Sequence, residues 1–212
     1  MSNKIYITRA KKSDWDFNFW SDKAQPTRYK VIARLIGDWD PNIKISKRKK
    51  YNASNPNVKK QQELYGLTAP GRFDDGLMTK KQEEIYGKLF NAIGLKNADQ
   101  MIHVQKPGQM HIIHIDDAYA GGRFNHMSEQ IKRKKVHRVF IMLDDWHPGQ
   151  VMLMGNQHVY KWKKGDVLWF DWPNLPHGTA NFGHHDRPLL FITGEETEQF
   201  KKLLKKKRNI KI

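Results

Sequence analysis

Eight short segments with the composition of β-strands follow one another between residues 100 and 194. They are rich in branched aliphatic and aromatic residues, and Gly, Pro, Asn or Asp residues, which are typical of turns, separate most of them. Regularly spaced short strands predict packed antiparallel sheets, and eight is the strand number of a jelly roll. The segments are residues 100–106, 110–116, 136–144, 150–154, 157–162, 166–171, 177–182 and 188–194.

The second segment ends in His114-Ile115-Asp116, and a later segment opens with His177. Residues i and i+2 of a strand point to the same side of the sheet, so one strand can direct both an imidazole and a carboxylate to one place. Two imidazoles and one carboxylate form the facial triad of non-haem Fe(II) oxygenases, which leaves open positions on the metal. We therefore predict a metal site made by His114, Asp116 and His177.

Arg187 opens the last predicted strand, ten residues after His177. We expect this strand to lie antiparallel to the strand of His177, which would bring the arginine beside the metal. A guanidinium binds a carboxylate through two parallel hydrogen bonds and stays charged near neutral pH. Arg187 is thus the candidate anchor for a dicarboxylate cosubstrate that chelates the metal. Arg138 is a second candidate cation for the cosubstrate, with a cross-strand pair as its alternative role.

Together these residues resemble the 2-oxoglutarate/Fe(II)-dependent dioxygenases, which carry His-x-Asp, a distal His and a downstream Arg or Lys on a double-stranded β-helix. The resemblance covers residues 100–194, and residues 165–194 look most like aspartyl/asparaginyl and prolyl hydroxylase-like members and small phage and marine bacterial members. It implies Fe(II), 2-oxoglutarate and dioxygen as cofactor and cosubstrates. The implied reaction hydroxylates an unactivated C–H bond while 2-oxoglutarate is converted to succinate and carbon dioxide.

Several residues near the predicted site are candidates for substrate binding. Tyr119, Arg123 and Asn125 lie in a Gly-containing loop that follows the His-x-Asp pair, and Trp146 lies in a turn after the third strand. Loops at a pocket mouth often hold substrate contacts, whereas a simple connector, or a tryptophan that covers the hydrophobic end, is the alternative. We expect a protein or peptide side chain as substrate, with a small molecule such as an amino acid as the rival.

Two alternatives to an oxygenase remain open at this point. Gly165, Pro173, His177 and Asn181 loosely follow the second motif of the cupins, so a cupin that does not use 2-oxoglutarate is one. The other is a non-catalytic, basic, cupin-like module that binds nucleic acid, because the chain has a formal net charge of +16. The charge is concentrated at residues 44–60, 132–135 and 201–208, although charge runs are usually solvated faces.

Length and composition agree with a single main domain that carries extensions. We predict a mainly β (α+β) protein with a double-stranded β-helix core and flanking helices. Residues 1–75 form an N-terminal extension with a basic loop, residues 76–194 the jelly-roll core with a bracing helix, and residues 195–212 a basic helix and tail.

The bracing helix is predicted to begin after Thr79, to carry Ile85, Leu89 and Ile93 on one face, and to end at Gly94. The chain contains no cysteine, which removes disulfides and thiolate metal ligands. Its first residues lack the apolar run of a signal peptide, and no run of eighteen uncharged apolar residues occurs. We therefore expect a cytoplasmic protein without a membrane span, whose oligomeric state the sequence leaves open.

Overall fold

All eight predicted core strands are present in the computed structural model, which describes residues 29–40, 74–76, 80–114, 116, 124, 126–155 and 157–212. The predicted ends agree with the observed ones to within a few residues, because turn residues and a change of hydrophobic pattern mark most boundaries. The core strands are β3 (Lys96–Gln105), β4 (Met110–His114), β5 (Val136–Met142), β6 (Gln150–Met154), β7 (Gln157–Val159), β8 (Asp166–Phe170), β9 (His177–Asn181) and β10 (Arg187–Glu195).

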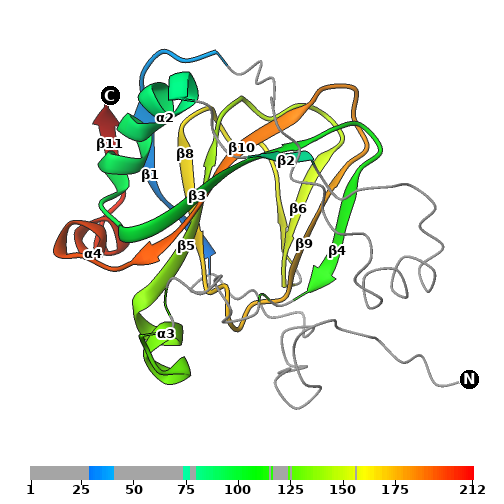
Figure 1. The fold of residues 1–212 in the computed structure, drawn as a ribbon. Helices are drawn as coiled ribbons and strands as arrows, with labels where there is room; N and C mark the ends of the chain where they lie inside the picture. Colours follow the sequence, from blue (N-terminus) through cyan, green and yellow to red (C-terminus); the bar gives the residue numbers. More distant parts are fainter. Residues whose placement is uncertain are drawn as a thin grey trace, which may run out of the picture.

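The core strands form two facing sheets connected as a double-stranded β-helix (Figure 1). Four of them lie in the order β8-β5-β10-β3 in the larger sheet, and the other four form the smaller sheet in the order β4-β9-β6-β7. All pairings among them are antiparallel. The predicted fold class, a mainly β protein with a jelly-roll core and flanking helices, is therefore confirmed.

Three further strands, which were not predicted from the sequence, extend the larger sheet. β1 (Tyr29–Ile36) pairs with β8, β11 (Arg208–Lys211) pairs in parallel with β1, and β2 (Asp74–Gly76) pairs with β3. β1 and β11 fall in the ranges predicted as N-terminal extension and C-terminal tail. β11 is short and basic and has no hydrophobic alternation, so only its pairing with β1 reveals it as a strand.

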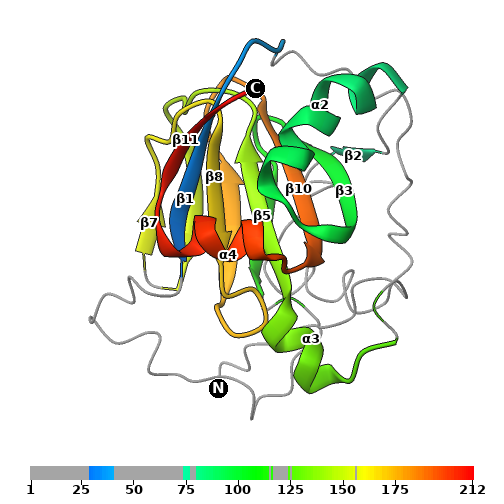
Figure 2. The ribbon, with the colours of Figure 1, turned by 90° about the vertical axis from the view of Figure 1, so that its left-hand side faces the viewer.

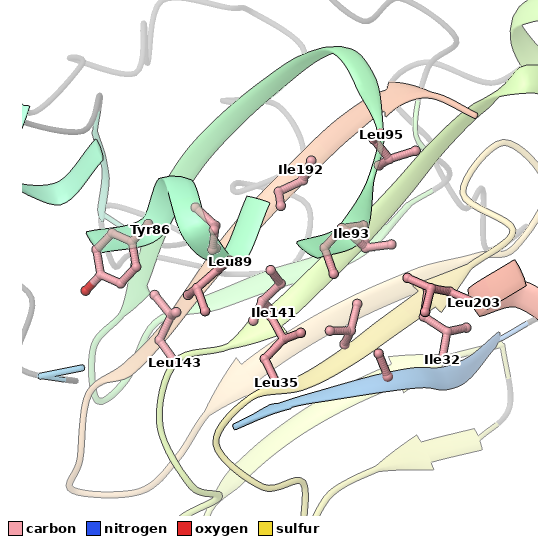
Figure 3. Close-up of a cluster of buried hydrophobic side chains, with 14 of the residues drawn as sticks. Ile32, Leu35, Tyr86, Leu89, Ile93, Leu95, Ile141, Leu143, Ile192 and Leu203 are labelled. Atoms are coloured by element: carbon pink, nitrogen blue, oxygen red, sulfur yellow. The ribbon is translucent and has the colours of Figure 1, made fainter. Parts of the chain in front are cut away.

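Helices α2 (Lys80–Ile93) and α4 (Glu198–Lys205) cover the outer face of the larger sheet (Figure 2). Figure 3 shows side chains from α2, α4 and the strands meeting in this outer core. Gly94 has a φ of 72° and ends α2 as predicted, because glycine adopts this left-handed conformation without strain. Phe200 and Leu203 of α4 are buried, so the predicted basic C-terminal helix packs on the sheet through an apolar side.

The buried face of α2 differs from the predicted one. Leu89 and Ile93 are buried, but Ile85 is 38% exposed and Tyr86 is buried instead. Residues four apart in an α-helix are rotated by about 40°, so Ile85 lies about 80° around the helix from Ile93. The predicted cap residue Thr79 lies outside the described residues. A third helix, α3 (Glu129–Lys135), was not predicted; it follows the N-cap Ser128 and leads directly into β5. No helix in the described ranges has the length and apolarity needed to span a bilayer.

A half-buried histidine joins α4 to the larger sheet. His137 Nδ1 accepts a hydrogen bond of 3.2 Å from the indole Nε1 of Trp169, and the His137 ring centroid lies 4.9 Å from that of Phe200. Glu196 Oε2 is 3.5 Å from His137 Nε2. Burial lowers the pKa of His137 in spite of this carboxylate, so the folded protein favours the neutral ring.

We expect the unfolding free energy to fall as the pH decreases below about 6.5, because His137 takes up a proton more readily in the unfolded chain. His137→Gln should make this loss smaller, since the amide does not titrate in this range. The measurement is the melting temperature at about pH 8 and about pH 5.5, which bracket the ordinary histidine pKa of about 6.5. His184→Gln, at an exposed position, is the control, and its melting temperature should change between these two pH values as much as that of the wild type. An equal change in melting temperature in His137→Gln and wild type would contradict the role of His137 in this pH dependence.

Candidate functional site

His177 is held in a single orientation by the turn that precedes it. The backbone N–H groups of Asn174 and Leu175 both donate to the carbonyl of Asp171, at 3.0 and 2.8 Å. His177 Nδ1 lies 2.9 Å from the carbonyl oxygen of Leu175. Since a carbonyl only accepts, Nδ1 carries a proton, and Nε2 is the nitrogen that could bind a metal. This is the arrangement in which metal-binding histidines are oriented by an outer hydrogen bond.

Asp116 lies next to the other nitrogen of this ring, Nε2. Asp116 Oδ2 lies 3.4 Å from His177 Nε2, and His177 is 4% exposed. Two ligand atoms at right angles, each about 2.0–2.2 Å from a metal, are about 3 Å apart. The observed distance therefore fits neighbouring positions in one coordination shell. The nitrogen and oxygen donors also match what non-haem iron accepts.

The structure places His114 next to this pair through its backbone. The Cα of His114 is the register partner of His177 in the β4–β9 ladder, after an irregularity that begins at His111. The side chain of His114 is not described, and Tyr119, Arg123 and Asn125 lie outside the described residues. Among the side chains that are described, no three His, Asp or Glu groups gather at one point. The role of His114 as third ligand stays a prediction.

Arg187 is a buried cation that lacks a counter-charge among the described residues. It is 3% exposed, its Nη1 donates to the Val151 carbonyl at 3.4 Å, and its Cζ lies 5.9 Å from the Trp162 ring centroid. Its Nε is buried and has no hydrogen-bond partner in the described part of the chain. Burial lowers the pKa of Arg187 to about 9, which still leaves it protonated at neutral pH. An unpaired buried cation is costly, so this position favours an anionic ligand.

Arg187 reaches the space between the sheets from the opposite sheet to the one predicted. β10 pairs with β3 and β5, and β9 pairs with β4 and β6. The prediction that the last strand lies beside the His177 strand is therefore wrong. The five residues between β9 and β10 carry the chain from one sheet to the other, and the Asn181 side chain holds this crossing by donating to the carbonyls of Gln105 and His185, both at 2.8 Å.

The separation between Arg187 and His177 along the strand direction follows from the strand register. Val151, whose carbonyl accepts from Arg187, is the register partner of Ala180 in β9. Ala180 is three residues beyond His177, which corresponds to about 10 Å along the strand. A five-carbon diacid, together with one metal–oxygen bond and one hydrogen bond, spans a separation of this size.

The other predicted site residues are placed differently. Arg138 reaches the Asp116–His177 pair, because its Nη1 lies 2.5 Å from Asp116 Oδ2. Trp146 follows β5 at the end away from Arg138, where its indole Nε1 donates to the Gln150 carbonyl at 2.7 Å. The structure thus brings Arg138 to the candidate metal ligands and does not bring Trp146 there.

Two residues beside the site were missed by the sequence analysis. Trp172 lies under the guanidinium of Arg138, with 4.3 Å from Arg138 Cζ to the ring centroid, and Thr193 Oγ1 accepts from Arg138 Nε at 3.1 Å. Trp172 stands five residues before His177, in the same turn, so its position next to a predicted ligand was the available signal. Thr193 comes from a distant strand and only the β5–β10 register reveals it.

The chain matches no protein-family model and no curated protein sequence. Solved structures similar to it include a predicted oxalate decarboxylase from Thermotoga maritima, at 15% identity over 59% of this chain and 83% of that one, with a TM-score of 0.36. A protein with a double-stranded β-helix domain from Klebsiella pneumoniae has 13% identity over 60% and 80%, with a TM-score of 0.35. An RmlC-like cupin from Shewanella frigidimarina has 11% identity over 49% and 70%, with a TM-score of 0.31. These likenesses concern the fold, whose assignment rests on the strand order.

Proposed function

We propose that the protein is an Fe(II)- and 2-oxoglutarate-dependent dioxygenase that hydroxylates an unactivated C–H bond. The observation that carries this proposal is the approach of Asp116 Oδ2 to within 3.4 Å of His177 Nε2, on a ring whose Nδ1 lies 2.9 Å from the Leu175 carbonyl oxygen. The buried guanidinium of Arg187 lies between the same sheets, without a counter-charge among the described residues. A metal ligand pair and a buried anion site in one barrel suit a cosubstrate that binds through both of its ends.

Each residue has a separate task in this proposal. His177 and Asp116, with His114, would hold the iron, which supplies the activation of dioxygen coupled to oxidative decarboxylation of 2-oxoglutarate. The Leu175 carbonyl keeps the His177 proton on Nδ1, so that Nε2 stays available as a ligand. Arg187 binds the far carboxylate and orients the cosubstrate.

The walls between the two sheets are apolar. The buried side chains of this inner core come from both sheets and include Phe140, Met142, Met152, Met154, Leu168, Phe170 and Leu189. Such walls exclude water, which strengthens the attraction between Arg187 and a carboxylate and protects a reactive centre from side reactions. Phe170 also packs edge-on against His177, with ring centroids 4.7 Å apart.

We propose a protein or peptide side chain as the substrate, preferably in an acidic context. The net charge of +16 favours an acidic partner, and the described part of the chain exposes Lys202, Lys205, Lys206, Lys207 and Arg208 in one run. A free amino acid is the competing substrate class, and the same experiment separates the two.

The test is aerobic incubation of the full chain with Fe(II), 2-oxoglutarate and either lysate proteins or an amino acid mixture. We expect succinate to form in a metal-dependent way, and mass spectrometry to show an added oxygen atom on a protein of the lysate. Added oxygen only on a free amino acid would overturn the substrate class and keep the enzyme class. Absence of both succinate formation and metal-dependent 2-oxoglutarate binding would contradict the dioxygenase, and a gel shift would then test the nucleic-acid module.

A further inference from the structure

The Asp116 carboxylate has a second buried neighbour besides His177. Arg138 Nη1 lies 2.5 Å from Asp116 Oδ2, and this same oxygen faces His177 Nε2 at 3.4 Å. Arg138 is 7% exposed. A guanidinium next to a metal ligand repels the incoming cation, and the repulsion is strong where water is excluded. Charge alone therefore does not explain an arginine at this position.

Asp116 follows the strand that carries His114. β4 ends at His114, so Asp116 lies beyond the hydrogen-bonded ladder that orients the residues of the strand. An aspartate outside a ladder has several side-chain rotamers of similar energy. A ligand oxygen in such a position needs a side-chain contact to keep it directed at the metal.

Arg138 itself is held on three sides. It lies opposite Thr193 in the β5–β10 register, and its Nε donates to Thr193 Oγ1 at 3.1 Å. Its guanidinium stacks on Trp172, whose indole Nε1 donates to the Val136 carbonyl at 2.8 Å and whose side chain is 1% exposed. The third contact is the ion pair with Asp116. The guanidinium is therefore a rigid support that extends from the larger sheet to the carboxylate.

We propose that Arg138 is a positioning residue that holds Asp116 Oδ2 in the direction required for metal binding. This role rests on the proposed function and is distinct from binding the cosubstrate. A carboxylate oxygen has two lone pairs, so Oδ2 can accept from Arg138 and also ligate a metal. Outer hydrogen bonds to ligating carboxylates are a recurrent feature of metal sites, and their loss costs about 10–100-fold in metal affinity.

The direction of the change in metal affinity tests this role. Arg138→Met removes a positive charge next to the ligands, which by charge alone would tighten metal binding. If Arg138 positions Asp116, Mn(II) binding should instead weaken by about 10–100-fold. Binding is measured by the electron paramagnetic resonance signal of unbound Mn(II), with no cosubstrate and no turnover. Arg208→Met is the control, because it removes an exposed guanidinium of β11 that has no role in the site, and it should not weaken Mn(II) binding.

Thr193→Val provides a second, milder variant. It keeps Arg138 and nearly the same volume and removes only the oxygen that accepts from Arg138 Nε, so Mn(II) binding should weaken by a smaller factor. If Arg138→Met fails to fold, the Mn(II) affinity of Thr193→Val tests the role of Arg138. Unchanged or tighter Mn(II) binding in the folded variants would overturn the role of Arg138. If His177→Ala also binds Mn(II) as the wild type does, the proposed metal centre itself fails, and the two failures are therefore distinguishable.

Discussion

Replacement of His177 by alanine should abolish Fe(II) binding and all succinate formation. The imidazole is buried, its Nδ1 donates to the Leu175 carbonyl, and its Nε2 faces Asp116. Loss of an outer hydrogen bond alone lowers metal affinity by about 10–100-fold, so loss of a ligand should lower it by at least about 100-fold. Titration with Fe(II) under nitrogen measures binding, and succinate measures turnover.

His111→Ala is the matched control for this experiment. His111 belongs to the same strand as His114 and is the register partner of Thr179, two residues beyond His177 in β9. His111 therefore lies about 7 Å along the strand from the pair made by His114 and His177, beyond the reach of a shared metal, and the His111→Ala protein should bind Fe(II) as the wild type does. The assignment of the metal centre fails if His177→Ala retains wild-type Fe(II) affinity, or if both variants lose it equally.

The core of the fold could be predicted because its strands carry the pattern that burial on two faces requires. Phe140 and Met142 of β5 face the inner core, while Val139 and Ile141, which alternate with them, face the helices, so residues 139–142 form a continuous apolar run. β11 has no such pattern and is a strand only because it pairs with β1. Segments of this kind depend on tertiary contacts, which a local pattern does not contain.

The types of residue in the candidate site could be predicted from the sequence, but the strand pairings that bring them together could be predicted only in part. The i, i+2 spacing pointed to Asp116, and the turn before β9 pointed to His177, and the structure brings these two together. The strand partner of Arg187 was wrong, because a short turn suggests a hairpin whereas this turn crosses between sheets. The contact of Arg138 with Asp116 depends on the register of β5 with β10 and on a side chain beyond the end of β4, which no local signal records.

Arg187→Met should leave metal binding intact and greatly weaken the binding of 2-oxoglutarate. Methionine occupies a similar volume and removes the cation that, in the proposed function, pairs with the far carboxylate. Loss of one partner of a buried, hydrogen-bonded charge pair costs about 2–5 kcal/mol. At about 1.4 kcal/mol for each tenfold change, the dissociation constant should rise by about 30-fold to more than 1,000-fold. Calorimetric titration with 2-oxoglutarate in the presence of Mn(II) measures this change, and Arg208→Met, at an exposed position of β11, is the control.

The pH dependence of the same titration tests whether Arg187 acts through its charge. Burial lowers the pKa of Arg187 to about 9 in the free protein, and 2-oxoglutarate would bind the protonated guanidinium. The wild-type affinity should therefore be constant between about pH 7 and about pH 8 and should fall as the pH rises through 9. Arg187→Met lacks the titrating group, so its weak affinity should not change over this range. A wild-type affinity for 2-oxoglutarate in Arg187→Met would remove Arg187 from the site, because the variant lacks the buried positive charge that is proposed to bind the far carboxylate.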